Sequence, residues 1–381
     1  MKRAIPLNDN IYWIGVNDRE THLFESHWPL PQGIAYNSYI IKDSQIALVD
    51  TVKAPYQTDY VEKIKCLIGE AQVDYLIINH MEPDHSGAIS MIRDMYPGIQ
   101  VVGNAKTKEF LAGFYHMDEP FITVEDGDEL DLGTTKLKFL IAPMIHWPET
   151  MITYDKTSGV FFTGDAFGGF GTLDGGIFDD ELEMNFYKEE ILRYFSNIVG
   201  KYSVPVQKAI KRLKGLKINT VAPTHGPIWR SDPARIIKAY NRWSKFKTQK
   251  GVIIVYGSMY GNTKRMAEEI ARTLSENGIE KVIVHDISKT NVSYIIKDIW
   301  KFKGLILGSC TYNTKIFPPM GNLIQFLENI KFKNHILGIF GNYSWSGGGL
   351  TQLKKFAENG KWDVIKPSFE AKHSQIGRAH V

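Results

Sequence analysis

The sequence has little cysteine, no long hydrophobic run and no excess of charge of one sign. Cys66 and Cys310 are the only cysteines among 381 residues. They form no C-x-x-C pair, which excludes a disulfide framework and a metal site built from thiolates. No run approaches the roughly 18 apolar residues of a membrane-spanning helix, and the first residues lack the apolar core of a signal peptide. We therefore expect a protein of the reducing cytoplasm that has no membrane partner.

The balance of charge argues against nucleic acid as a partner. The 45 Lys and Arg residues nearly match the 42 Asp and Glu residues, which leaves a formal net charge of +3. Proteins that neutralise phosphate groups usually carry a much larger basic excess. With 43% hydrophobic and 23% charged residues, the chain has the composition of an ordinary folded protein.

The length and the pattern of the chain predict two α/β domains. A single compact domain rarely reaches this length. Short β-rich runs alternate with loops and helical stretches in the first part, whereas regular strand and helix alternation begins near Lys250. The polar, basic segment 241–250 separates the two patterns. We place the first domain at residues 1–248 and the second at residues 251–374.

The pattern of the second domain predicts a doubly wound parallel sheet. Residues 251–258 have the pattern of a buried strand, and residues 261–278 that of an amphipathic helix ending at a glycine. Further buried-strand patterns follow at 281–287, 304–310 and 335–341.

The end of the chain departs from this pattern. Where a doubly wound sheet supplies its last covering helix, the sequence runs into KHSQIGRAHV. One reading frame of a common sequencing adapter encodes Ile376 to Val381. We therefore expect residues 375–381 to be a non-native tail and the last helix to be missing.

Four potential metal ligands follow one strand of the first domain. The apolar run YLIIN leads directly into His80, Glu82, Asp84 and His85. Pro83 stiffens this loop, so that several side chains can point to one place. A polar loop that caps a helix explains any one of these residues as well as a metal does, but it does not explain all four. The motif therefore predicts a metal site.

Three further candidates, His146, Asp165 and His225, each follow an apolar β run in the first domain. With the first motif they supply four imidazoles and three carboxylates. These suffice for two metal ions with at least three protein ligands each and with positions open for a further ligand. Imidazole and carboxylate without thiolate suit iron or manganese, and zinc accepts the same ligands.

Three loops of the second domain predict a site for a phosphate and a flat ring. Each loop follows a predicted parallel strand, which is where doubly wound sheets bind their ligands. The first loop precedes a helix, whose N-terminal amides favour a phosphate, although the same residue types often only cap a helix. The candidate residues are Ser258, Met259, Tyr260, Gly261, Asn262, Thr263, Ser309, Cys310, Thr311, Tyr312, Asn313, Asn342, Tyr343, Ser344, Trp345, Ser346 and Gly347.

The residue types in these loops leave two interpretations open. Tyr312 and Trp345 lie among small residues, which suits a planar ring, but core aromatics are the alternative. The absence of a G-x-G-x-x-G motif argues against a dinucleotide. Packing explains the lone Cys310 better than redox chemistry does, and Cys66 is expected on the core face of a helix.

The spacing of the metal ligands resembles that of the flavodiiron proteins, also called A-type flavoproteins. The sequence shows H-x-E-x-D-H at residues 80–85, followed by the three later ligands, and the resemblance covers about residues 1–374. Zinc hydrolases of the metallo-β-lactamase fold usually carry a second histidine where this chain carries Glu82. The resemblance therefore implies iron. It also implies a metallo-β-lactamase-like αββα sandwich followed by a flavodoxin-like doubly wound parallel sheet.

The resemblance further implies a role for each site residue. FMN occupies the three loops, as in a short-chain flavodoxin, and feeds electrons to a diiron site that reduces O2 to water or NO to N2O. Tyr194 resembles a pocket tyrosine that hydrogen-bonds a metal-bound ligand, and an ordinary aromatic on a helix face is the alternative. The implied iron ligands are His80, Glu82 and His146 on one ion, Asp84, His85 and His225 on the other, and Asp165 on both.

The resemblance implies protein partners as well. Because the chain has no C-x-x-C iron site, the electron donor is a separate protein, rubredoxin or a similar small electron-donor protein. In the family the FMN of one subunit lies against the diiron site of another, which implies a head-to-tail homodimer or a dimer of dimers. Many members carry a histidine where this chain has Glu25, directly after Phe24, so the preference between O2 and NO stays open.

Two other functions compete with this interpretation. A zinc hydrolase of the metallo-β-lactamase fold, fused to an FMN module, would attack an ester or phosphodiester with a metal-bound hydroxide. Glu82 and the flavodoxin-like pattern argue against it. The second alternative is an electron carrier whose first domain has lost its metals, and the complete set of seven ligands argues against that.

Overall fold

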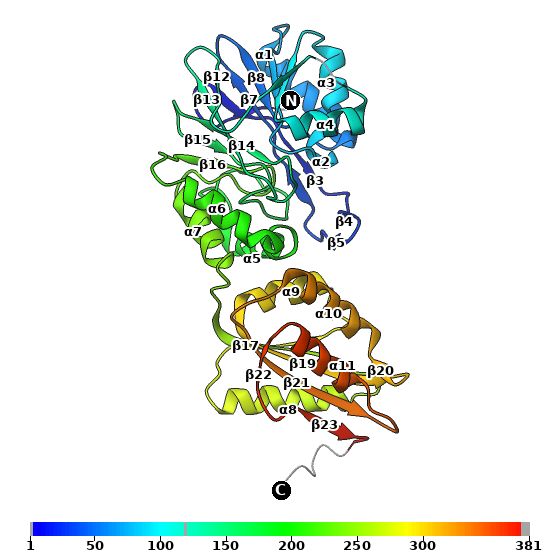
Figure 1. The fold of residues 1–381 in the computed structure, drawn as a ribbon. Helices are drawn as coiled ribbons and strands as arrows, with labels where there is room; N and C mark the ends of the chain where they lie inside the picture. The colour runs from blue at the N-terminus through cyan, green and yellow to red at the C-terminus, as the bar shows by residue number, and fades with distance from the viewer. Residues whose placement is uncertain (1–2, 118–119, 375–381) are drawn as a thin grey trace. The chain divides into compact units, whose positions relative to one another are not determined.

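The computed structural model describes residues 3–117 and 120–374, and these form two compact units (Figure 1). The first unit is Met1–Ser244 and the second is Lys245–Val381, so the division lies inside the polar segment 241–250. Each unit buries its own apolar side chains, such as Leu48 in the first and Leu307 in the second.

Two mixed sheets form the first unit. The first sheet has the strand order β1-β2-β7-β8-β9-β10-β11, and its strands are parallel from β8 onwards. The second has the order β12-β13-β14-β15-β16, with a parallel pair at β15 and β16. Two short antiparallel pairs, β3 with β6 and β4 with β5, accompany them. The strands are β1 (Ile5–Pro6), β2 (Ile11–Trp13), β3 (Val16–Asp18), β4 (Leu23–Phe24), β5 (Trp28–Pro29), β6 (Ile34–Tyr36), β7 (Tyr39–Lys42), β8 (Ile46–Val49), β9 (Tyr75–Ile77), β10 (Gln100–Gly103), β11 (Phe121–Thr123), β12 (Glu129–Asp131), β13 (Lys136–Ile141), β14 (Met151–Asp155), β15 (Val160–Phe162) and β16 (Thr220–Ala222).

Helices lie beside both sheets, as the predicted αββα sandwich requires. In Figure 1, α1, α3 and α4 gather near the first sheet, and α5, α6 and α7 near the second. The helices are η1 (Ala54–Tyr56), α1 (Gln57–Ile68), α2 (Pro83–Ser86), α3 (Ile89–Met95), α4 (Ala105–Tyr115), α5 (Met184–Tyr194), the π-helical η2 (Phe195–Val199), η3 (Gly200–Tyr202), α6 (Ser203–Arg212) and α7 (Pro233–Trp243).

The candidate metal ligands lie where strands end. Shortly after β9 the chain reaches His80, and Pro83 at the first position of α2 starts a helical turn that carries Asp84 and His85. Asp165 follows β15 and His225 follows β16. Because these two strands are parallel neighbours, their carboxyl ends lie at the same edge of the sheet, which brings the side chains together.

A doubly wound parallel sheet forms the second unit, as the sequence predicts. The strand order is β18-β17-β19-β21-β22, with β23 also beside β21, and all of these pairs are parallel. Helix α8 lies on one face, and α9 and α10 lie on the other (Figure 1). The elements are β17 (Gln249–Gly257), α8 (Asn262–Glu276), β18 (Val282–Asp286), α9 (Val292–Lys301), β19 (Phe302–Tyr312), β20 (Lys315–Ile316), α10 (Pro318–Ile330), β21 (Ile336–Tyr343), α11 (Gly349–Asn359), β22 (Asp363–Val364) and β23 (Phe369–Lys372).

The turn from β17 into α8 depends on a glycine. Gly261 precedes the helix with φ of 88°, a left-handed conformation that glycine adopts without steric cost. No side chain in the described part of the chain caps α8. Its first backbone N–H groups therefore lack the usual side-chain acceptor and are available to a ligand.

The prediction for Cys66 is wrong. The residue lies on α1, but its side chain is exposed. The buried positions of this helix are Tyr60, Val61, Ile64 and Ile68. Residue 66 falls midway between the last two of these, so helical periodicity turns it to the other side.

The expectations for the end of the chain lie outside the described residues. This applies to the predicted non-native tail, residues 375–381, and to the helix that we expected to be missing. Among residues 3–117 and 120–374, the helices are too short or too polar to cross a lipid bilayer.

Candidate metal centre and flavin site

Seven side chains of the first unit gather into two groups that could each hold a metal ion. In each group, one nitrogen or oxygen atom per residue lies within 4.8 Å of the others. All of them are buried except Asp84, which is partly buried. The structure thus brings every predicted ligand together. The first group is His80, Glu82, His146 and Asp165, and the second is Asp84, His85 and His225.

The first group directs two imidazoles and two carboxylates to one point. His146 Nε2 lies 3.0 Å from Glu82 Oε2 and 3.2 Å from Asp165 Oδ2. His80 Nε2 lies 3.3 Å from Glu82 Oε2 and 3.8 Å from Asp165 Oδ2. This set of donors suits iron, manganese or zinc.

The second group lies on the other side of Asp165. His85 Nε2 is 2.9 Å from Asp165 Oδ1 and 3.4 Å from Asp84 Oδ1. His225 Nε2 is 3.4 Å from Asp84 Oδ2 and 3.7 Å from Asp165 Oδ1. Asp165 therefore offers Oδ2 to the first group and Oδ1 to the second, an arrangement that fits a carboxylate shared by two metal ions.

Two hydroxyl groups hold the Asp165 carboxylate in place. Tyr194 OH donates a hydrogen bond to Oδ2 at 2.8 Å, and Thr224 Oγ1 donates one to Oδ1 at 2.6 Å. Tyr194 is fully buried, so the structure places it at the metal site and not on an unrelated helix face. Thr224 was not predicted, because a threonine before a histidine carries no signal of its own.

Outer hydrogen bonds orient two of the imidazoles. Glu149 Oε1 lies 2.7 Å from His80 Nδ1, and the backbone oxygen of Ala35 lies 2.8 Å from His225 Nδ1. A carboxylate and a carbonyl oxygen only accept hydrogen bonds, so we assign the proton to Nδ1 in both rings. Nε2 of each ring then presents its lone pair to a metal. Glu149 was also missed by the sequence analysis, because its partner His80 is distant along the chain.

Atoms of the second group lack the hydrogen-bond partners that buried polar atoms normally have. Both carboxylate oxygens of Asp84 and the Nε2 atom of His225 are buried without a hydrogen bond in the described part of the chain. Native proteins rarely leave such atoms unpaired. A metal ion bound here would satisfy all of them, so these residues fit the implied metal.

The charges of the metal-free site also fit bound cations. Burial alone would lower the pKa of His85, but the carboxylates of Asp84 and Asp165 outweigh it and raise this pKa to about 9. For His146, hydrogen bonds to Asp165 and Glu82 overcome the same effect of burial and raise the pKa to about 9. Without metal, both imidazoles therefore carry protons at neutral pH, and a metal ion takes the place of these protons.

The affinity of the site for metal should therefore keep rising with pH to an unusually high value. A metal must displace the protons of His85 and His146, and these leave the metal-free site only near pH 9. We expect the apparent affinity for Co²⁺ or Fe²⁺ to rise with pH up to about 9, well past the ordinary histidine pKa of about 6.5. Competition with a chelator at several pH values measures this affinity. A plateau already at pH 7 would contradict the expectation.

Aromatic rings form a wall beside His225. The ring centroids of Phe24 and Tyr194 both lie 5.5 Å from that of His225, and the centroid of Tyr36 lies 5.8 Å away. Phe170 packs edge-on against Phe24 at 5.6 Å and against Tyr194 at 5.1 Å. These buried rings make the surroundings of His225 largely apolar, which suits a small, uncharged ligand better than a charged one.

Glu25 follows Phe24 and carries a titratable group close to the metal ligands. Its Oε2 accepts a hydrogen bond from Trp28 Nε1 at 3.2 Å. Although Glu25 reaches solvent, the loss of water around its carboxyl and the negative charge of Glu82 raise its pKa to about 7. Glu25 therefore holds a proton for part of the time near neutral pH, as a histidine at this position would.

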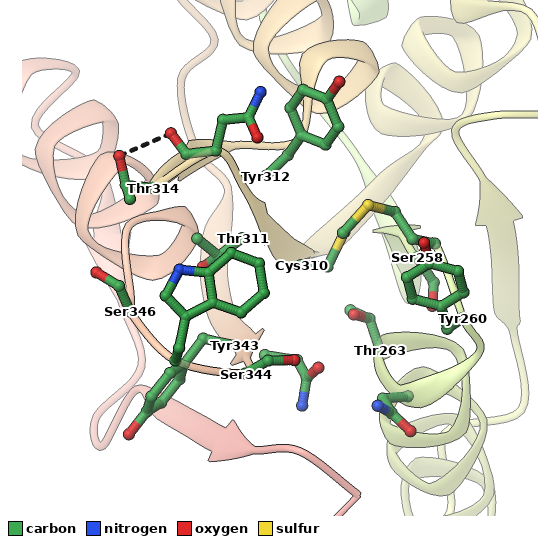
Figure 2. Close-up of a pocket in the computed structure, with 15 residues that line it drawn as sticks. Ser258, Tyr260, Thr263, Cys310, Thr311, Tyr312, Thr314, Tyr343, Ser344 and Ser346 are labelled. Carbon is green, nitrogen blue, oxygen red and sulfur yellow. Dashed lines mark hydrogen bonds between the residues drawn. The ribbon is translucent and has the colours of Figure 1, made fainter.

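A cavity of about 300 Å³ in the second unit is lined by the three predicted loops (Figure 2). Its volume lies within the range of small-molecule sites. Gly261, Ser309 and Gly347 do not line it, and Thr314, which was not predicted, does. Ser309 is buried instead, and its Oγ accepts a hydrogen bond from the backbone N–H of Phe317 at 3.2 Å. The lining residues are Ser258, Met259, Tyr260, Asn262, Thr263, Cys310, Thr311, Tyr312, Asn313, Thr314, Asn342, Tyr343, Ser344, Trp345 and Ser346.

Aromatic side chains are exposed around this cavity. Tyr260 is 88% exposed, Trp345 is 82% exposed and Tyr312 is 42% exposed. The alternative that Tyr312 and Trp345 are core residues is therefore wrong. In Figure 2 the rings of Tyr260 and Tyr312 belong to two different segments of the cavity lining, so a flat ring can find an aromatic face on either segment.

The first loop contains unsatisfied groups that suit a phosphate. Thr263 Oγ1 is buried without a hydrogen-bond partner in the described residues. It lies in the first turn of α8, whose N-terminus has no side-chain cap. Ser258 Oγ already accepts the N–H of Gly261 at 3.0 Å, which shapes the turn. The phosphate of FMN would accept hydrogen bonds from Thr263 and from the helix amides, so these residues fit the implied flavin.

Comparison with known families matches each unit separately. The description "ODP family beta lactamase" matches residues 34–226, and "Flavodoxin" matches residues 254–371. The nitric oxide reductase of Moorella thermoacetica is 33% identical over 371 residues, which cover 96% of this chain and 92% of that protein.

Solved structures match nearly the whole chain. The rubredoxin oxygen:oxidoreductase of Desulfovibrio gigas superimposes with a TM-score of 0.93 at 27% identity, covering 97% of this chain and 93% of that one. A variant of the flavo di-iron protein of Thermotoga maritima gives 0.91 at 28% identity, covering 98% and 94%. Fold and site together define a two-domain protein that joins a β-lactamase-like metal unit to a flavodoxin. The chain belongs to the flavodiiron protein family.

Proposed function

We propose that the protein reduces O2 to water, NO to N2O, or both, at two iron ions that receive electrons through FMN. The observation that carries this proposal is Asp165, which offers one carboxylate oxygen to each of two ligand groups in a chain that also has a flavin-sized cavity. Relatives are named as a nitric oxide reductase and a rubredoxin oxygen:oxidoreductase. Two NO molecules require two electrons and two protons to give N2O and water, and one O2 requires four of each to give two waters.

The chain itself positions these groups. When bound, the iron pair supplies open coordination positions and redox chemistry, and FMN supplies electrons singly or in pairs. Three ligands would hold each iron, and Asp165 would contact both. Tyr194 and Thr224 fix the orientation of Asp165 by their hydrogen bonds. Glu25, with a pKa of about 7, can hold and release a proton at its carboxyl near the ligands.

Replacing Thr263 by alanine should weaken FMN binding about 10- to 100-fold, because a hydrogen bond to a charged group contributes roughly 1.5–3 kcal/mol. Titration of the flavin-free protein with FMN, followed by the quenching of flavin fluorescence, measures the affinity. Thr273 lies exposed on the same helix, so Thr273→Ala is a matched control that should bind FMN like the wild type. Equal affinities of all three proteins would rule out Thr263 as a phosphate ligand.

We propose rubredoxin, or a similar small electron-donor protein, as the redox partner. The rubredoxin in the name of the Desulfovibrio gigas relative supports it. We place the reaction in the cytoplasm, where the free thiols of Cys66 and Cys310 remain reduced.

The proposed assembly is a head-to-tail homodimer, or a dimer of such dimers. The two units carry opposite charge: Lys245–Val381 has 20 Lys and Arg against 10 Asp and Glu, whereas Met1–Ser244 has 25 against 32. Opposite charges favour contact between the second unit of one subunit and the first unit of another. Light scattering should give the mass of two or four chains at low salt, and a single chain would contradict the assembly.

Anaerobic purification, followed by metal and flavin analysis, tests the function directly. We expect about two irons and about one FMN per chain. The reduced protein, supplied with reduced rubredoxin, should then consume O2, NO or both in a gas-electrode assay. The ratio of the two rates measures the preference that the sequence leaves open.

Two outcomes would contradict this proposal in different ways. Zinc in place of iron, with no gas consumption and with turnover of an ester or phosphodiester, would support the hydrolase. FMN without any metal in the first unit would support the electron carrier.

A further inference from the structure

Glu149 is a buried carboxylate behind one metal ligand. Its side chain is 0% exposed. Its Oε1 accepts hydrogen bonds from His80 Nδ1 at 2.7 Å and from the backbone N–H of Met81 at 2.9 Å. Asn104 Nδ2 donates to the backbone oxygen of Glu149 at 2.5 Å. Side chain and backbone of Glu149 are therefore both held in place against His80.

The second ligand group has no equivalent carboxylate. His225 Nδ1 contacts the neutral backbone oxygen of Ala35. His85 Nδ1 is buried without a hydrogen-bond partner in the described part of the chain. In the second group, one histidine Nδ1 therefore contacts a neutral backbone oxygen and the other has no hydrogen-bond partner in the described residues. Neither Nδ1 is hydrogen-bonded to a carboxylate.

The metal-facing ligands of the two groups are otherwise alike. Each group has two imidazoles and one carboxylate of its own, and the two groups share Asp165. Each oxygen of Asp165 also accepts one hydroxyl, from Tyr194 on the first side and from Thr224 on the second. The buried carboxylate of Asp50 interacts electrostatically with both His85 and His80, so it does not belong to one group alone. Glu149 differs from it because Glu149 is hydrogen-bonded directly to the Nδ1 atom of a ligand imidazole, and only in the first group.

The negative charge of Glu149 needs a cation nearby. Its Oε2 is buried without a hydrogen-bond partner among the described residues. A buried carboxylate that is incompletely paired is strongly disfavoured, unless a positive charge compensates it. A metal ion on His80 Nε2 supplies that charge through the imidazole ring, and the carboxylate in turn makes the imidazole a stronger electron donor.

We propose that Glu149 is a positioning residue that makes the two metal positions unequal. It makes the position formed by His80, Glu82 and His146 the tighter one. With iron in both positions, the iron on His80 is also the first to lose an electron when the pair is oxidised. The statement about affinity depends only on the residues, whereas the statement about electron loss rests on the proposed diiron function.

The test of affinity is the variant Glu149→Gln, which keeps the shape of the side chain and removes its charge. Competition between the full-length protein and a chelator measures the binding of two Fe²⁺ or two Co²⁺ ions. We expect one of the two to bind about 10- to 100-fold more weakly and the other to bind as in the wild type. Asp155→Asn is the matched control, because Asp155 is buried on β14 and hydrogen-bonded by Ser158, and it should leave both ions unchanged.

The test of electron loss is spectroscopic. In a titration with ferricyanide, each oxidant molecule takes one electron, so the pair passes through a mixed-valent form that is visible by electron paramagnetic resonance. Glu149→Gln should reduce the maximum amount of this form, because the two irons become more alike. In Mössbauer spectra of the diferrous protein, only one of the two iron sites should change.

Specific outcomes would overturn the inference. If both ions bound more weakly by the same factor, Glu149 would have only a general structural role. If both ions bound as in the wild type, Glu149 would have no role in metal binding. If Glu149→Gln does not fold, Glu149→Asp keeps the charge at a greater distance and should weaken one ion selectively. If the wild type holds two Co²⁺ ions but never two irons, the proposed function fails while the affinity test still decides about Glu149.

Discussion

Asp165→Asn should abolish gas reduction while leaving the flavin in place. The variant loses the charge that serves both ligand groups through Oδ1 and Oδ2. We expect at least one of the two irons to be lost and turnover to fall by more than about 100-fold, beyond the 10- to 100-fold effect of changing an outer partner of a metal ligand. FMN content should stay at the wild-type value, because the flavin loops belong to the other unit.

The measurement combines metal analysis, flavin analysis and a gas-electrode assay on one sample of each protein. Asp155→Asn makes the same chemical change at another buried aspartate of the first unit, so it separates loss of the metal from a general loss of stability. It should keep about two irons and wild-type turnover. Wild-type O2 or NO reduction by Asp165→Asn would show that the assigned metal centre is not the site of the reaction.

Glu82→His should convert the protein from an iron protein into one that prefers zinc. Glu82 Oε2 lies 3.3 Å from His80 Nε2 and 3.0 Å from His146 Nε2. A histidine there would give three imidazoles in this group, a ligand set typical of zinc, and would remove one negative charge that stabilises ferric iron. We expect the ratio of zinc to iron to rise at least about tenfold after growth with both metals, and gas reduction to fall in proportion to the lost iron.

Metal analysis after growth in medium with equal iron and zinc measures this change. Glu70→His provides the control, because Glu70 lies exposed just beyond α1 and adds a histidine without touching the metal site. That control should retain iron. If Glu82→His also retained two irons with wild-type turnover, then Glu82 would not be what selects iron in this chain.

Much of the metal centre could be predicted because its ligands follow a simple rule of sheet geometry. Asp165 and His225 come directly after β15 and β16, whose parallel pairing brings their ends to one edge. His80 follows β9 in a short loop, and His85 lies in the helical turn that begins at Pro83. The apolar pattern of a strand can be recognised in the sequence and shows where the strand ends. Unusual polar residues at that end can therefore be recognised as well.

The supporting residues could not be predicted in the same way. Glu149 acts on His80, and Thr224 acts on Asp165, through contacts between segments that are distant along the chain. Neither residue type is unusual in its own sequence context. Only the packing of the sheet ends shows which ordinary polar residue faces which ligand.

The solvent exposure of side chains was a second property that the local sequence pattern did not predict reliably. Cys66 was expected on the core face of a helix, yet it is exposed on α1. For Trp345 a place in the core was the open alternative, yet it is 82% exposed at the rim of the flavin cavity. Whether an apolar side chain is covered depends on what packs over it, and a short sequence window does not contain that information.

The sequence by itself determined the two-domain order, the α/β class, the seven metal-ligand candidates and the three flavin loops. Strand periodicity, glycine-dependent turns and clustered ligand types are local properties, so they can be recognised in the sequence itself. The tertiary structure alone decided that the hydroxyls of Tyr194 and Thr224 hold Asp165, and that Glu149 stands behind only one of the two ligand groups. These facts depend on distances between remote segments, which are set when the sheets pack and their strand ends converge.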